Sequence, residues 1–152
     1  MNKIVKIILI FLMLSGCGYQ PILLNKKYNF QFVNIIAQGD NNINKIIKDN
    51  LTNRKKNNAS KIFDINFISK REKETISSNA KGDPKVYKMK VFVNYQVKEK
   101  NEVILSKSIS KQTTYNNIDD KFELLKYEEN ILKDLSNSLS SEILISIATT
   151  DK

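Results

Sequence analysis

The sequence has no histidine and only one cysteine, Cys17, among its 152 residues. A structural zinc site needs several Cys or His ligands, so the usual kind of zinc site cannot be built. Ser-His-Asp and Cys-His catalytic units each need a histidine, so the lack of histidine excludes them as well. A single cysteine also cannot form a disulfide within the chain.

Glycine is scarce as well, with four residues in the chain. Neither of the glycine-rich phosphate-binding patterns, GxGxxG or GxxxxGK[ST], occurs. The acidic residues Asp119, Asp120, Glu123, Glu128 and Glu129 lie where we expect the start and the solvated face of a helix. A site built from carboxylates alone is the one catalytic option left open. The sequence therefore predicts a protein that is not an enzyme and that uses no cofactor.

The charge balance is basic, with 25 Lys and Arg against 16 Asp and Glu and a net charge of +9. Such a balance attracts nucleic acid, anionic lipid or acidic partners. The abundance of Lys, Asn and Ile is equally well explained by AT-rich coding. No RNP motif, zinc finger or arginine-rich arm is present, so we expect no nucleic-acid partner. The length and ordinary composition predict one globular domain.

Residues 1–16 have the pattern of a secretory signal peptide. Lys3 and Lys6 precede an apolar run over residues 7–14, and two small residues follow. A transmembrane helix would need about 20 apolar residues, which is far more than this run contains. A core helix is a further alternative, but it would need neither the basic start nor the small-residue exit.

The stretch Leu14-Ser15-Gly16-Cys17 resembles the lipobox of bacterial lipoproteins. The resemblance implies that Cys17 carries an S-diacylglycerol and an N-acyl group and is the first mature residue. Each buried CH₂ contributes about 0.8 kcal/mol, and two or more chains anchor a protein firmly. Gly18, in place of Asp, implies export to the outer membrane. The alternative for a lone cysteine is a buried free thiol.

The mature chain is expected to comprise a lipidated tether at 17–28 and a single domain at 29–152. Alternation of apolar and polar residues predicts strands, and spacings of three and four predict helices. The strands are expected at 29–36, 61–68, 86–98 and 103–115, with one helix near 43–51, capped by Asp40, and a long one from Asp120. This order, β-α-β-β-β-α, predicts an α+β two-layer sandwich with a mainly antiparallel four-stranded sheet and two helices on one face.

Two further predictions concern the packing of the last helix and the conformation of residues 69–84. In the last helix we expect one apolar stripe facing the sheet, with Lys126, Asn137 and Ser140 among the residues away from it. The stripe comprises Phe122, Leu125, Ile131, Leu132, Leu135, Leu139, Ile143 and Ile147. Residues 69–84 either extend the preceding strand into a long hairpin arm or are mobile.

Several of these features together resemble the LptE family of outer-membrane LPS-assembly lipoproteins. They are Cys17-Gly18-Tyr19 with Pro21, Tyr115-Asn116 after the last strand, and the helix segment from Tyr127 to Leu135. The resemblance implies a non-catalytic protein facing the periplasm from the outer membrane. Members plug and help assemble the β-barrel LptD and assist lipopolysaccharide insertion into the outer leaflet. The alternative is a stand-alone envelope lipoprotein that binds lipid or another ligand.

Lipopolysaccharide carries phosphates and carboxylates, which Lys and Arg clusters bind well. The candidate contacts are Lys70, Arg71 and Lys73 near the arm, and Lys98 and Lys100 at the other hairpin. The alternative is that these are solvated charges that protect the sheet from pairing with other sheets.

An apolar group is predicted on the polar side of the sheet. Phe92 lies between Lys90 and Asn94 on the polar face of its strand, and Ile68 and Ile104 are expected to share that face. A cluster of three exposed apolar side chains marks a contact surface. We therefore expect Ile68, Phe92 and Ile104 to contact the barrel.

Overall fold

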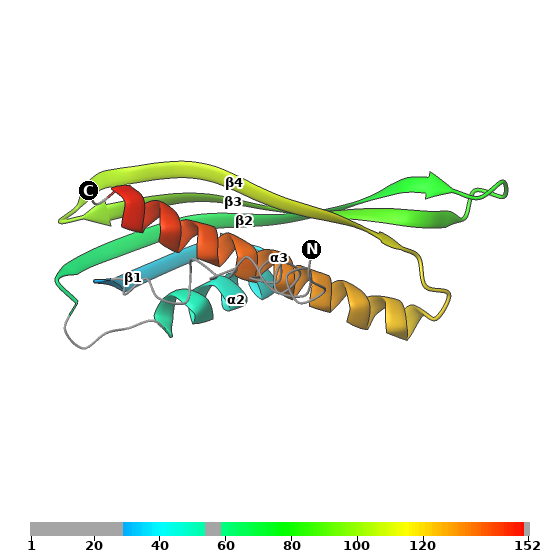
Figure 1. Ribbon diagram of the computed structural model, residues 1–152, viewed down its shortest axis with the longest axis horizontal. Coiled ribbons are helices and arrows are strands. Elements are labelled where there is room, and N and C mark those ends of the chain that lie inside the picture. The colour runs from blue at the N-terminus through cyan, green and yellow to red at the C-terminus, as the bar shows by residue number, and fades with distance from the viewer. Residues whose placement is uncertain (1–28, 54–58, 151–152) are drawn as a thin grey trace, which may run out of the picture.

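The computed structural model describes residues 29–53 and 59–150 (Figure 1). The predicted signal peptide and tether, including Cys17, lie outside the described residues. The elements are β1 (Phe30–Gly39), α2 (Asn41–Thr52), β2 (Lys61–Ser78), β3 (Pro84–Glu99), β4 (Glu102–Asn116) and α3 (Lys121–Thr150). The predicted element order and the α+β class are confirmed.

The strands form one sheet in the order β1-β2-β3-β4. The β2–β3 and β3–β4 pairs are antiparallel, as expected of a mainly antiparallel sheet. The β1–β2 pair is parallel, because α2 carries the chain back to the starting end between these two strands. The sheet is therefore mixed. Both helices cover the same face of it, which confirms the two-layer arrangement (Figure 1).

The core lies between the sheet and the helices. In β3 the predicted alternation is observed, with Met89, Val91, Val93, Tyr95 and Val97 all buried. The neighbouring strand β2 adds three buried side chains to the same face, Phe63, Ile65 and Phe67. Side chains on this face alternate with exposed ones, so the other face of the sheet stays open.

The junction between β1 and α2 is tightly built. Asp40 caps the helix as predicted, since its Oδ1 accepts hydrogen bonds from two backbone N–H groups of the first turn at 3.0 and 3.3 Å. Gly39 has φ +100 and lies against the backbone of Ser69. The Ser69 hydroxyl donates to the buried Asn44 Oδ1 at 2.7 Å. Strand β2 and helix α2 are therefore joined by polar contacts as well as by the core.

Helix α3 begins after Asp120, whose Oδ1 accepts from the backbone N–H of Phe122 at 2.8 Å. The predicted apolar stripe is wrong in its first turns. Phe122 and Leu125 are 76% and 61% exposed, whereas Leu124 is buried. The reason is that polar residues occupy part of the stripe that faces the sheet. Glu128 lies on that stripe one turn after Leu124, so a search for apolar residues alone does not find the stripe there.

The serines of α3 are a second correction. Ser140, expected on the exposed side, is 1% exposed, and Ser136 is fully buried. Their hydroxyls donate to carbonyl oxygens one turn earlier at 2.8 and 2.7 Å, so neither is left unpaired. The Asn50 amide of α2 donates to Asn137 at 2.8 Å and to Ser140 at 3.2 Å. Polar side chains thus join the two helices at this point.

Residues 69–84 form the hairpin arm, the first of the two alternatives. Strands β2 and β3 stay paired as far as Ser78 and Pro84, just past the end of β4 at Asn116, with register shifts after Thr75 (Figure 1). The tip is closed by a hydrogen bond from the Asn79 N–H to the Asp83 carbonyl at 2.9 Å, and the Asn79 side chain accepts from the Lys81 N–H at 2.9 Å. An ion pair between Lys88 and Glu74 at 2.7 Å bridges the two strands of the arm.

Two buried tyrosines allow a paired test of this packing. The Tyr115 hydroxyl donates a hydrogen bond to the Glu128 carboxylate at 2.8 Å. The Tyr95 hydroxyl lies near Ser146 but has no hydrogen-bond partner in normal geometry among the described residues. Burial is the main cause that raises the pKa of both. We expect Tyr115→Phe to lower the free energy of unfolding by about 1.5–3 kcal/mol, and Tyr95→Phe to leave it unchanged or raise it slightly. Urea unfolding of both variants measures this, and equal losses would contradict the assignment.

Candidate functional site on the open face of the sheet

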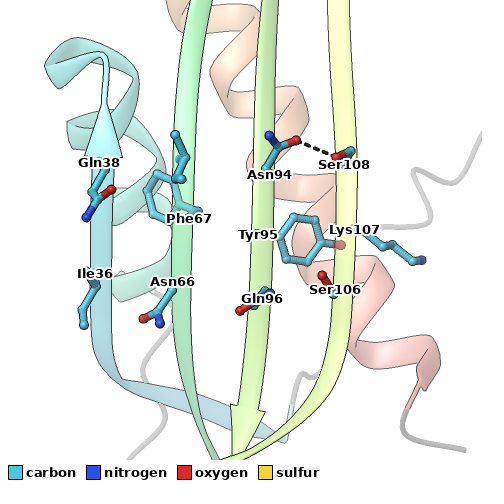
Figure 2. A pocket seen from close by; sticks show the side chains of 11 residues that line it. Ile36, Gln38, Asn66, Phe67, Asn94, Tyr95, Gln96, Ser106, Lys107 and Ser108 are labelled. Carbon is cyan, nitrogen blue, oxygen red and sulfur yellow. Dashed lines mark hydrogen bonds between the residues drawn. The ribbon is translucent and has the colours of Figure 1, made fainter.

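The face of the sheet away from the helices carries two rows of side chains that cross all four strands. One row is Ile36, Asn66, Gln96 and Ser106, and the next is Gln38, Ile68, Asn94 and Ser108. Figure 2 shows both rows from the open side, with the helices behind the strands. We call these eight residues the neutral rows, because none of them carries a charge.

The neutral rows, together with Phe67, Tyr95 and Lys107, line an open hollow of about 510 Å³. The Lys107 ammonium is directed to α3, where it lies 3.5 Å from the Ser146 hydroxyl oxygen. Ile36 and Ile68 are 57% and 54% exposed, so apolar surface is available there. Asn94 Oδ1 accepts from the Ser108 hydroxyl at 2.6 Å. The side chains of Asn66 and Gln96 make no hydrogen bond among the described residues. The hollow therefore offers unused amide donors and acceptors beside aliphatic side chains.

Charged residues bound the neutral rows on both sides. Beyond one row, Lys70 lies opposite Phe92. Beyond the other, Asp64 lies opposite Lys98. The Asp64 carboxylate accepts from the Asn34 backbone N–H at 3.2 Å and from its side-chain amide at 2.8 Å. The uncharged zone is thus limited to the two central rows.

The first group of predicted lipopolysaccharide contacts is divided between the two faces of the sheet. Lys70 lies on the open face, and its side chain is 70% exposed and paired with the next glutamate at 2.7 Å. Arg71 and Lys73 lie on the helix side. Arg71 pairs with Asp40 at 3.4 Å, and Lys73 pairs with Glu128 at 2.5 Å. The structure does not bring these three cations together on one surface.

The second group, Lys98 and Lys100, lies at the opposite end of the sheet. Lys98 is on the open face, six positions along β3 from Phe92, which corresponds to about 20 Å. Lys100 is in the β3–β4 turn with φ +48. Both line a second hollow of about 600 Å³, whose other charged lining residues are Lys61, Asp64 and Glu99. Neither Lys98 nor Lys100 forms an ion pair with any residue that the structure describes.

The predicted barrel contacts are only partly brought together. Ile68 and Phe92 lie diagonally across β2 and β3 on the open face, since Ile68 is opposite Asn94. The Lys90 ammonium is 4.3 Å from the centre of the Phe92 ring. Ile104 is 36% exposed and lies at a break in register near the β3–β4 turn, far along the sheet from the other two.

Sequence reasoning missed the part of the neutral rows that β1 supplies. Phe30 and Phe32 face the core, but the register shifts between Phe32 and Asn34. This bulge reverses the alternation, so Ile36 points to the open face instead of the core (Figure 2). The loose alternation of NFQFVNII was the available signal, but it did not place the bulge.

Neither a metal site nor a membrane-spanning helix is found among the described residues. They contain no group of three or more His, Cys, Asp or Glu side chains that could hold a metal ion. In the same part of the chain, no helix combines the length and hydropathy that crossing a membrane requires.

No protein-family model matches the sequence, and no curated protein matches it significantly. Solved structures are similar. Rare lipoprotein B from Shewanella oneidensis is 17% identical with a TM-score of 0.60, and the match covers 78% of this chain and 96% of that one. Lipoprotein B from Nitrosomonas europaea is 17% identical with a TM-score of 0.54, over 89% and 94%. A minor lipoprotein from Acinetobacter baumannii is 11% identical with a TM-score of 0.54, over 80% and 92%.

The chain has the fold of these bacterial lipoproteins. Identities of 11–17% establish the shared fold alone. These proteins are described as lipoprotein B or minor lipoprotein and not as LptE.

Proposed function

We propose that the chain is an outer-membrane lipoprotein of the LptE type, anchored through an acylated Cys17. It occupies the lumen of an LptD-type β-barrel and assists lipopolysaccharide insertion into the outer leaflet. The observation that carries this proposal is a lipoprotein fold that follows a lipobox sequence. The fold is established by the similarity to solved lipoproteins, and the lipobox is inferred from the sequence of residues 14–17.

The open face supports a place inside a barrel. The lumen of an outer-membrane barrel is polar, and its walls are lined by uncharged and charged hydrophilic side chains. The neutral rows and the flanking Lys70, Asp64 and Lys98 present the same kind of surface. Ile68 and Phe92 add a small apolar contact on that face.

Lys98 and Lys100 are the better candidates for contact with lipopolysaccharide phosphates. Arg71 and Lys73 already pair with carboxylates that hold the helices on the sheet. Lys98 and Lys100 make no ion pair among the described residues, so their charges are available to an anion. A charge-assisted hydrogen bond to phosphate is about twice as strong as a neutral one.

Affinity purification of the tagged, lipidated chain from outer membranes tests this function. We expect a large barrel protein to co-purify with the parent chain, and Phe92→Ser to reduce its yield several-fold, because Phe92 lies on the proposed contact face. Phe122→Ser is the matched control, since Phe122 is 76% exposed at the start of α3 and should not affect the yield.

The alternative, a stand-alone ligand-binding lipoprotein, is supported by the open hollow of about 510 Å³. It predicts that the parent chain purifies with lipid and without a barrel. That result, or an equal loss of barrel in the two phenylalanine variants, would contradict the proposed barrel contact.

A further inference from the structure

The lack of charge in the neutral rows contrasts with the rest of the chain. Charged residues make up 27% of the sequence, and the net charge is +9. Yet eight open-face positions in two complete rows across four strands include none. Charges return on both sides, with Lys70 beyond one row and Asp64 and Lys98 beyond the other. The central zone is therefore a bounded surface that suits an uncharged ligand.

The groups that the neutral rows present define the ligand's chemistry more closely. A side-chain amide has both a donor and an acceptor, and a hydroxyl can act as either. The amides of Asn66 and Gln96 are side by side in one row and make no hydrogen bond among the described residues. Ile36 and Ile68 provide aliphatic surface beside them. A matching ligand carries many hydroxyls, has apolar C–H faces and bears no net charge.

We propose that the neutral rows bind an uncharged oligosaccharide, whose hydroxyls pair with Asn66, Gln96 and their neighbours. A peptide fits this surface less well, because an added peptide strand joins the edge of a sheet through its backbone and does not lie on a face. A charged ligand would lose hydration without gaining a counter-charge within the rows.

The spacing of the strands and of the rows sets the size of the surface that the neutral rows offer to an oligosaccharide. The three gaps between four strands span about 14 Å, and the two rows lie about 7 Å apart. The sugar chain lies across the strands, over Ile36 and Ile68 at one end and toward Ser106 and Ser108 at the other. Ile68 also belongs to the proposed barrel contact, so the sugar site is tested on the chain without a barrel; sugar binding does not depend on the lysines at the sheet ends.

An array of immobilised neutral oligosaccharides, including maltoheptaose and chitohexaose, tests the inference with the full lipidated chain in detergent. We expect at least one neutral sugar to bind. Replacing two amides in Asn66→Ala/Gln96→Ala should weaken that binding by about tenfold, because two neutral hydrogen bonds are lost. Gln112→Ala is the matched control, since Gln112 is an exposed open-face residue outside the neutral rows, opposite Lys90.

The same experiment separates this site from the charged end of the sheet. Binding in the neutral rows should be unchanged by added salt, whereas anion binding at Lys98 and Lys100 should weaken. The inference is overturned if no neutral sugar binds, if the double variant binds as well as the parent, or if salt abolishes binding. Stronger capture of extended peptides at the same residues would also overturn it. Thermal unfolding of the variants confirms that the exposed substitutions leave the fold intact.

Discussion

Gly39→Ala is expected to lower the free energy of unfolding by about 3–5 kcal/mol, which is among the largest effects of a single substitution. A β-carbon at this position would lie 1.9 Å from the Ser69 carbonyl oxygen. That atom belongs to the backbone of a central strand and cannot rotate away. The φ of +100 adds strain for any residue with a β-carbon. Urea unfolding of the variant measures the loss.

Gly82→Ala provides the matched control for this prediction. Gly82 also has a positive φ, of +88, but apart from its two chain neighbours no described residue has an atom within 4 Å of the point that an added β-carbon would occupy. The loss should therefore be limited to the backbone strain of about 1–2 kcal/mol. If both variants lost the same stability, the close approach of β1 to β2 at Ser69 would not be the cause.

Cys17→Ser is expected to move the protein from the membrane fraction to the soluble fraction. The substitution removes the thiol that the lipobox resemblance assigns to the diacylglycerol. Two or more acyl chains hold a protein on a bilayer, with about 0.8 kcal/mol for each buried CH₂, and no chain would remain. Fractionation of cells that express the variant, followed by mass analysis of the N-terminal residue, measures both the location and the modification.

Gly18→Asp distinguishes anchoring from sorting. This variant keeps the lipobox cysteine and should stay in the membrane fraction. By the lipoprotein resemblance it should remain in the inner membrane, while the parent reaches the outer one. A Cys17→Ser protein that still pelleted with membranes and carried no lipid would contradict the lipidation assignment.

The sequence predicted the fold well where one face of an element is uniformly apolar. Strand β3 alternates in sequence apart from Phe92, and its burial follows the alternation from Met89 to Val97. Helix α3 was predicted less well, because Glu128, Ser136 and Ser140 lie among its inward-facing residues and hide the stripe from a count of apolar positions. Their polar atoms are satisfied by Tyr115, Lys73 and backbone carbonyls.

The candidate site was less accessible to sequence reasoning, since it depends on register across strands. The sequence placed Asn94 and Gln96 on an open face, but the partners beside them follow from the β2–β3 and β3–β4 registers. The contribution of Ile36 depends on the bulge in β1, and β-bulges have no clear pattern in one sequence. Arg71 and Lys73 have partners at the N-cap of α2 and on α3 that lie far away in the sequence.

The division of the sheet into a packed face and an open face also affects how the protein can change over generations. Most random substitutions that destabilise a domain act through its core, and surface positions usually alter stability by less than about 0.5 kcal/mol. The residues of the neutral rows are mostly exposed, so new side chains there would leave the core intact. A protein with this architecture can therefore acquire a different binding preference on one side while selection for folding acts on the other.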